Sequence, residues 1–199
     1  MRYWFDCEFL DDGERIDLIS IGLVAEDGRE LYACNLDAQL HRCHRKPDGS
    51  WGDSWMRENV LSKLPGYADP AWMYKRQIRT AVLDFMLASR DRGEWASSDV
   101  DPKRPTIDGK KPEIWAYYAD YDWVAFCQLF GRMIDLPPQF PRYCLDLKQL
   151  SVSSGSPEHP AKPPGAHNAL EDARWNRSLY EFLTVYRSTA KNMPPGDYL

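Results

Sequence analysis

The sequence of 199 residues lacks a long apolar run, since no stretch reaches the 18 uncharged apolar residues that would indicate a membrane-spanning helix. Its beginning also lacks the basic segment, apolar run and cleavage site of a secretory signal. The five cysteines include no Cys-x-x-Cys pair, and their odd number and scattered positions favour reduced thiols. These absences predict a soluble, cytoplasmic protein that is neither secreted nor bound to a membrane.

Positive charge is also in short supply. The 25 lysine and arginine residues are outnumbered by 30 acidic residues, which gives a net charge of -5. This balance argues against the broad basic surface that binds duplex DNA. Apolar residues are plentiful at 43%, including eight tryptophans, and can build one sizeable core. We therefore expect a single domain over residues 1–199, in which any nucleic acid is held at a local site.

The first part of the chain predicts a β-meander. Three apolar or β-branched runs, at residues 2–10, 15–25 and 30–35, are separated by Asp11-Asp12-Gly13 and Glu26-Asp27-Gly28. Asp-Gly breaks between such runs are strong hairpin signals. We expect three antiparallel strands here.

The rest of the chain predicts mostly helices. Asp69 followed by Pro70 has the pattern of a helix start, and the helical pattern continues to about residue 88. The other expected elements are a short helix around 54–63, a loop over 89–112, a strand over 113–119, a helix over 121–133, an unassigned segment over 142–150 and a last helix over 168–190. This order predicts a mixed α/β fold that opens with the antiparallel meander and is flanked by helices.

Two carboxylates interrupt the first apolar run, in Asp6-Cys7-Glu8. Residues two apart on a strand share a face, so Asp6 and Glu8 should project side by side. Two like charges on an apolar element are costly unless a cation lies between them, and divalent ions would supply that cation. About one Asp-x-Glu is expected by chance in such a chain, so the motif is weak alone. A second copy, Asp12-Gly13-Glu14, lies in a turn and needs only solvent.

A second acidic cluster, residues 167–172, opens the last predicted helix with His167-x-Ala169-x-x-Asp172. With four histidines in the chain, this pattern is expected by accident only about 0.03 times. A lone histidine before a helix is more often structural, and a lone aspartate there is usually a cap. Joint occurrence with Asp6 and Glu8 favours one metal site divided between the two ends of the chain.

These residues resemble the DEDDh group of 3'-5' exonucleases, whose relatives include oligoribonuclease, ribonuclease T and the proofreading subunit of bacterial DNA polymerase. The group is recognised by Asp-x-Glu on the opening strand, an aromatic-Asp step after a later strand, and His-x-x-x-x-Asp at the start of the last helix. The matching residues here are Asp6 and Glu8, Tyr121-Asp122, and His167 with Asp172. The second motif leaves one alternative open, because Asp120 could take the place of Asp122.

Within this group the chain looks most similar to small bacterial exoribonucleases of the polyadenylate-specific exoribonuclease AS type, over residues 6–9, 18–24 and 121–129. The sister DEDDy group would have tyrosine where Asn168 stands. The resemblance implies a ribonuclease H-like fold and a homodimer.

The resemblance also implies a two-metal mechanism, in which two ions clamp the attacking and leaving oxygens at phosphorus. Asp6, Glu8, Asp122 and Asp172 would hold the ions, and oxygen ligands suit Mg²⁺ or Mn²⁺. His167 would be the general base, neutral at pH 7 to 8. The expected reaction releases 5'-mononucleotides from the 3' end of single-stranded RNA.

Phe9 and Leu10 follow the first motif and could pack against the terminal base of the substrate, although both could equally be core residues. Two other functions stay open. One is a DNA-directed exonuclease with the same site, because the contact that separates RNA from DNA is local. The other is an inactive nucleic-acid-binding module, which intact acidic ligands make a weaker hypothesis.

Overall fold

The computed structural model describes residues 1–41, 54–87 and 105–190. A six-stranded mixed sheet lies at the centre, with strand order β4-β3-β2-β1-β5-β6. The strands are β1 (Arg2–Asp11), β2 (Ile16–Ala25), β3 (Glu30–Asn35), β4 (Trp72–Met73), β5 (Glu113–Ala116) and β6 (Leu145–Asp146). The α-helices are α1 (Ser54–Asn59), α2 (Lys75–Met86), α3 (Asp120–Gln128), α4 (Leu147–Ser153) and α5 (Ala169–Ala190).

The predicted meander is confirmed, because β1 pairs antiparallel with β2 and β2 with β3. Gly13 and Gly28 lie in the two connecting turns with φ values of +83° and +88°, a conformation that residues with a side chain rarely adopt. Strands β4, β5 and β6 add to this meander by parallel pairing, so the sheet is mixed and the α/β class is confirmed.

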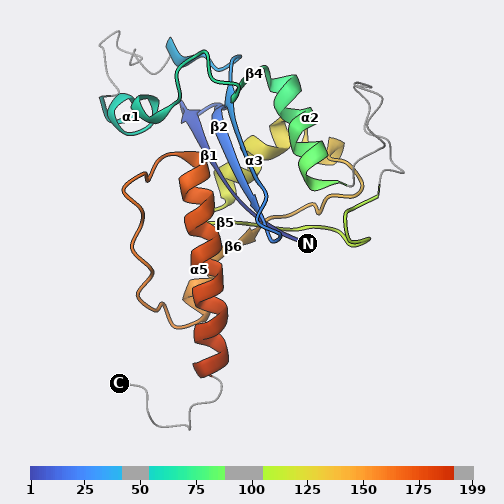
Figure 1. Cartoon of the computed structure of the whole chain (residues 1–199), viewed down its shortest axis with the longest axis vertical. Coiled ribbons are helices and arrows are strands. Elements are labelled where there is room, and N and C mark those ends of the chain that lie inside the picture. Colours follow the sequence, from blue (N-terminus) through green and yellow to red (C-terminus); the bar gives the residue numbers. More distant parts are fainter. Residues whose placement is uncertain (42–53, 88–104, 191–199) are drawn as a thin grey trace.

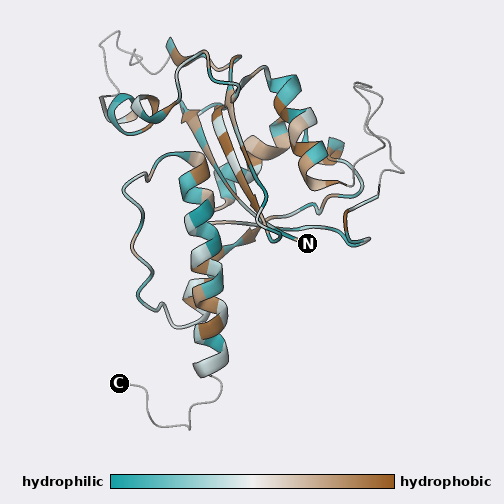
Figure 2. Cartoon of the chain, viewed as in Figure 1, coloured by the Kyte–Doolittle hydropathy of each residue, from teal (hydrophilic) through white to brown (hydrophobic). Residues whose placement is uncertain are grey.

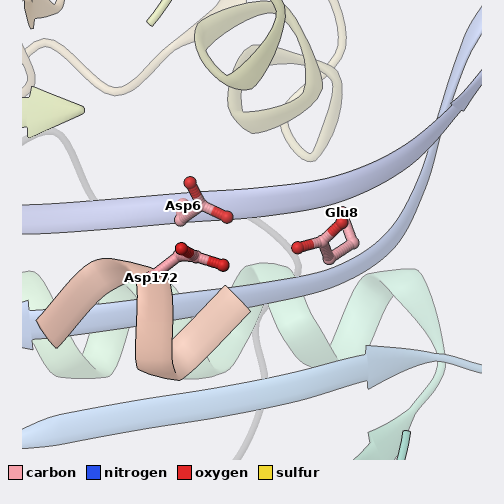
Figure 3. A group of neighbouring side chains, drawn as sticks. All are labelled: Asp6, Glu8 and Asp172. Atoms are coloured by element: carbon pink, nitrogen blue, oxygen red, sulfur yellow. The ribbon is translucent and has the colours of Figure 1, made fainter. Parts of the chain in front are cut away.

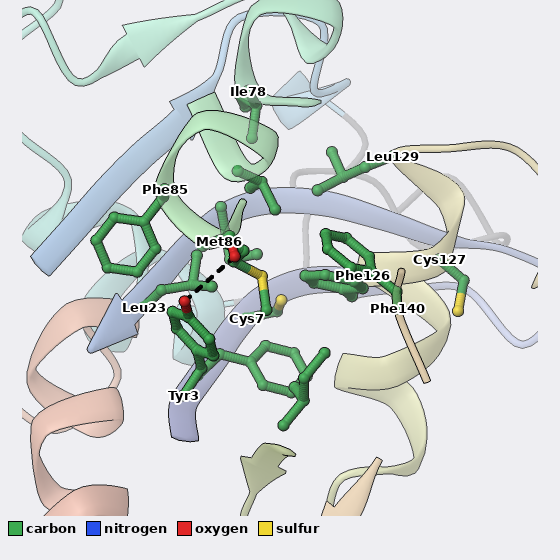
Figure 4. Close-up of a cluster of buried hydrophobic side chains, with 14 of the residues drawn as sticks. Tyr3, Cys7, Leu23, Ile78, Phe85, Met86, Phe126, Cys127, Leu129 and Phe140 are labelled. Carbon is green, nitrogen blue, oxygen red and sulfur yellow. Dashed lines mark hydrogen bonds between the residues drawn. The ribbon is translucent and has the colours of Figure 1, made fainter. Parts of the chain in front are cut away.

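Side chains alternate along β1 and serve the two faces of the sheet. Tyr3, Phe5 and Cys7 belong to a core cluster with residues of α2 and α3, whereas Trp4 belongs to a second cluster with residues of α4 and α5. Figure 4 shows the first cluster, in which the Tyr3 hydroxyl donates a hydrogen bond to the Met86 carbonyl at 3.3 Å. Helix α5 therefore lies on one side of the sheet, with α2 and α3 on the other (Figure 1).

The expected helix start at Asp69 and Pro70 is wrong. Trp72 and Met73 form strand β4 instead, which pairs in parallel with the end of β3. Helix α2 begins after Tyr74, whose backbone N–H donates to the Gln77 side chain. The pairing of β4 with β3 delays the helix, and no local pattern in residues 69–74 indicates it.

Two other boundaries differ from the expected ones. Strand β5 ends at Ala116, and α3 ends at Gln128, since Phe130 and Leu136 turn into the core. The unassigned segment 142–150 contains β6 and the first part of α4. The predicted loop 89–112 lies mostly outside the described residues, and the predicted final helix is confirmed as α5.

Helix α5 carries both hydrophilic and hydrophobic residues along its length (Figure 2), and Trp175, Leu179 and Leu183 are buried on one of its faces. Among the described residues, no helix is long and apolar enough to cross a membrane. The start of α5 approaches the sheet so closely that a Cβ atom added to Gly22 would lie 2.3 Å from the Ala169 carbonyl oxygen. Gly22 pairs with Asp6 across the β1–β2 ladder. The absence of a side chain at Gly22 therefore lets α5 begin directly over Asp6.

We expect Gly22→Ala to destabilise the protein by about 1 to 3 kcal/mol, because the new methyl group would collide with backbone atoms of Ala169 and Leu170 that cannot rotate away. Urea denaturation measures the effect. Gly66→Ala is the matched control, since a Cβ at Gly66 meets nothing within 4 Å. Equal stability of the two variants would contradict this account of the close approach.

Candidate active site

The alternation of β1 places Asp6 and Glu8 on the same face as Trp4, toward α5. Asp172, in the first turn of α5, faces them across the gap (Figure 3). One carboxylate oxygen from each of the three residues lies within 4.8 Å of the others. Residues distant in sequence thus converge on one point, as the two motifs predicted.

Local structure at the start of α5 fixes Asp172. The Asn168 side chain accepts hydrogen bonds from the Leu170 and Glu171 backbone N–H groups and so caps the helix. The His167 backbone N–H donates to Asp172 Oδ2 at 2.5 Å. Asp172 is 4% exposed, so its carboxylate is held by the chain rather than by solvent.

Asp122, in the first turn of α3, lies beside these carboxylates. The paired residues of β1 and β5 end at Trp4 and Trp115, and beyond them the Cys7 N–H donates to Asp122 Oδ1 at 2.7 Å. Asp122 is 6% exposed and close enough to Asp6 for its charge to raise the pKa of that residue. Asp120, the alternative left open by the sequence, is exposed. The structure therefore brings Asp122, and not Asp120, to the other carboxylates.

The assembled carboxylates resist ionisation. Burial, followed by the nearby carboxylates, raises the pKa of Asp6 well above its usual range. Burial likewise raises the pKa of Glu8 to about 8, with Asp172 and Asp122 adding to the effect. Burial also raises the pKa of Asp122 to about 7, against the hydrogen bond from Cys7. Such a site favours either protons or a cation.

Two lysines lie beside the carboxylates. Lys162 Nζ is 3.2 Å from Asp172 Oδ1, and the Lys63 ammonium donates to the Ala166 carbonyl, one residue before His167. Both positive charges lower the pKa of Glu8. Among the described residues, they offset part of the negative charge of the four carboxylates.

His167 stands at the rim of this group with a backbone φ of 67°, in the left-handed region that few non-glycine residues occupy. Its ring meets the Trp55 ring edge-on, with centroids 4.9 Å apart. Burial lowers the pKa of His167, and Lys63 and Lys162 lower it further against the opposing charge of Asp172. The imidazole is therefore neutral at neutral pH and able to accept a proton.

Phe9 and Leu10 follow Glu8 near the end of β1. Phe9 is partly buried against the core, and its ring lies 5.9 Å from that of Tyr121, which is 52% exposed. Leu10 is partly exposed and pairs with Asp17 of β2. Phe9 thus packs partly against the core, and contact of Phe9 and Leu10 with a substrate base stays a prediction.

Sequence reasoning missed three neighbours of the site: Trp55, Lys63 and Lys162. Trp55 is an exposed tryptophan in a short polar helix, and its exposure, which would indicate a binding role, is known only from the structure. Lys63 lies at the end of the predicted short helix around 54–63, and Lys162 lies in a segment without a helical or strand pattern. Their approach to the carboxylates depends on the folded chain.

The residues present fit a divalent cation. Their donors are carboxylate oxygens alone, the set preferred by Mg²⁺ and Mn²⁺. Three of them already converge within 4.8 Å, and burial makes their shared negative charge costly without a cation. Asp6, Glu8 and Asp172 offer the tightest set, and Asp122 stands next to it.

Comparison with known proteins identifies the family of the chain. The family described as the 3'-5' exoribonuclease Rv2179c-like domain matches residues 1–184. The chain belongs to this family. Two relatives from Mycobacterium tuberculosis are named 3'-5' exoribonuclease Rv2179c (strain ATCC 25618 / H37Rv) and 3'-5' exoribonuclease MT2234.1 (strain CDC 1551 / Oshkosh). Each is 39% identical to this chain over 185 residues, covering 92% of the chain and 94% of the relative.

The electrostatics of this family member predict a stability that depends on pH and on divalent ions. Glu8 and Asp122 have folded-state pKa values of about 8 and about 7, above the unfolded values of about 4.3 and about 3.9. The folded state holds extra protons between these values, so ion-free protein should lose stability as the pH rises from about 5 to 8.

Mg²⁺ held by these carboxylates would replace those protons and should therefore raise the melting temperature more at pH 8 than at pH 6. Thermal denaturation in EDTA and in excess Mg²⁺ at both pH values measures the difference. A gain that is equal at the two pH values, or larger at pH 6, would show that the carboxylates do not take up the ion.

Proposed function

We propose that the chain is a metal-dependent 3'-5' exoribonuclease that hydrolyses single-stranded RNA from the 3' end and releases 5'-mononucleotides. The observation that carries the proposal is the convergence of Asp6, Glu8 and Asp172 within 4.8 Å, with Asp122 beside them. The names of the two relatives support RNA as the substrate over DNA.

The finer assignment to the DEDDh group and to a ribonuclease H-like fold belongs to the same proposal. This assignment is supported by the positions of the five motif residues on the strands and helices. Asp6 and Glu8 are on the first strand, Asp122 opens the helix after β5, and His167 with Asp172 opens the last helix. The sheet also begins with the antiparallel meander expected for that fold.

Asp6, Glu8, Asp122 and Asp172 would hold two ions of Mg²⁺ or Mn²⁺. When bound, the ions supply Lewis-acid polarisation of the phosphodiester and stabilise charge on the attacking and leaving oxygens. The chain contributes rigidity, because Asp122 is fixed by the Cys7 N–H and Asp172 by the His167 N–H. Fixed ligands keep the geometry required for an in-line displacement.

His167 would act as the general base. Its lowered pKa keeps a ring nitrogen free to take the proton of the attacking water at neutral pH. The edge contact with Trp55 and the backbone bond to Asp172 keep the ring at the rim of the carboxylate group.

Phe9 and Leu10 would contact the terminal base of the RNA. The support is the exposed Tyr121 ring, 5.9 Å from the Phe9 ring, because exposed aromatic rings are surfaces on which bases can stack. The single-domain organisation, the homodimer and the cytoplasmic location expected from the sequence stay predictions.

We expect Asp6→Asn to reduce RNA hydrolysis by about a thousandfold or more, because the amide removes a charged ligand from the proposed metal site. Release of mononucleotides from matched RNA and DNA oligomers is the measurement. Asp120→Asn, which neutralises an exposed carboxylate nearby, should retain near wild-type activity. Near wild-type rates for Asp6→Asn would refute the metal assignment, and preferred digestion of DNA would refute the substrate.

His167→Ala should cut turnover by about 10² to 10⁴, the usual contribution of a general base, while metal affinity changes little. Single-turnover cleavage together with calorimetric Mn²⁺ titration separates the two effects. Unimpaired cleavage by this variant would show that His167 is not the general base, without contradicting the proposed metal ligands.

A further inference from the structure

Lys162 makes an ion pair with a carboxylate of the site itself. Its ammonium lies 3.2 Å from Asp172 Oδ1, and the Lys162 side chain is 46% exposed while that of Asp172 is 5% exposed. The other oxygen of Asp172 accepts the His167 backbone N–H. Asp172 Oδ1 therefore pairs with the half-exposed Lys162 side chain, whereas Asp172 Oδ2 is held by the backbone.

The segment that carries Lys162 is anchored against α5 and α4. The Trp175 indole N–H donates to the Pro160 carbonyl at 3.0 Å, and the Lys162 ammonium lies 4.9 Å from the centroid of the Trp175 ring. The His159 ring is 2.7 Å from the Ser151 hydroxyl on α4. These contacts hold the Lys162 ammonium close to Asp172. Ordering it there therefore costs less conformational entropy than ordering a free surface lysine.

The ammonium also acts on the whole group, since the Lys162 charge lowers the pKa of both Asp6 and Glu8. A divalent ion on Asp172 would therefore meet a positive charge already on that carboxylate. Two cations cannot share it at close range without strong repulsion.

We propose that Lys162 is an internal counter-cation of the metal site, which pairs with Asp172 in the ion-free protein and is displaced when a divalent ion binds. This inference rests on the proposed metal site and adds a residue that no motif contains. The half-exposed side chain of Lys162 has room to leave, whereas Asp172 does not. Displacement would release the ammonium beside the site, where an RNA phosphate could receive it.

The test is Mn²⁺ affinity, measured calorimetrically on the full chain without RNA. Lys162→Met should bind Mn²⁺ roughly three- to tenfold more tightly than the wild type, because the competing charge is gone. In EDTA the variant should melt at a lower temperature than the wild type, and excess Mn²⁺ should narrow that difference. Lys162→Arg, which keeps a positive charge, should stay within about twofold of the wild-type affinity.

Two controls separate contact from a general charge effect. Lys148→Met removes an ammonium that lies 5.8 Å from the Tyr118 ring centroid and leaves the Asp172 ion pair intact, so its Mn²⁺ affinity should be unchanged. Lys63→Met removes a charge near Glu8 that donates to a carbonyl instead of a carboxylate. It should gain less affinity than Lys162→Met.

Wild-type affinity in Lys162→Met, or an equal gain in Lys63→Met, would overturn the counter-cation while the metal site stands. Failure of the wild type to bind Mn²⁺ at these carboxylates would overturn both the counter-cation and the proposed function.

Discussion

Mutual repulsion among buried carboxylates is the constraint on which the rest of the site depends. Burial is the largest cause of the raised pKa of Asp6 and Glu8, and Asp122 and Asp172 raise the pKa of both further. The fold accepts this cost because strong elements hold the ligands from several sides. The meander fixes β1, and the bare backbone of Gly22 allows α5 to begin beside Asp6. A structure that only needed stability would place apolar side chains there.

Backbone N–H groups and ammonium groups both stabilise the charge of the buried carboxylates. Backbone N–H groups of Cys7 and His167 fix Asp122 and Asp172, and ammonium groups compensate what the backbone cannot. Exposed aromatic rings lie on both flanks, Tyr121 next to Phe9 and Trp55 next to His167. Carboxylates at the centre, with ammonium groups and aromatic rings around them, support the proposed binding of a substrate that carries phosphates and bases.

Much of this arrangement could be predicted from the sequence, and the failures have a common cause. Asp-Gly turns mark the meander, and strand periodicity places Asp6 and Glu8 on one face, because both signals are local. Strand β4 was missed because Trp72 and Met73 become a strand only by pairing with β3. Lys162 was missed for the same reason, since its partner Asp172 is supplied by the folded chain.

The proposed function requires that cations bind where these carboxylates meet. Crystals of the wild-type protein grown with Mn²⁺ and a 5'-mononucleotide, measured for anomalous scattering, locate the ions without reference to activity. We expect peaks on the carboxylate oxygens of Asp6, Glu8, Asp122 and Asp172, with the nucleotide phosphate against them. Anomalous density elsewhere, or none at these four side chains at saturating Mn²⁺, would contradict the account.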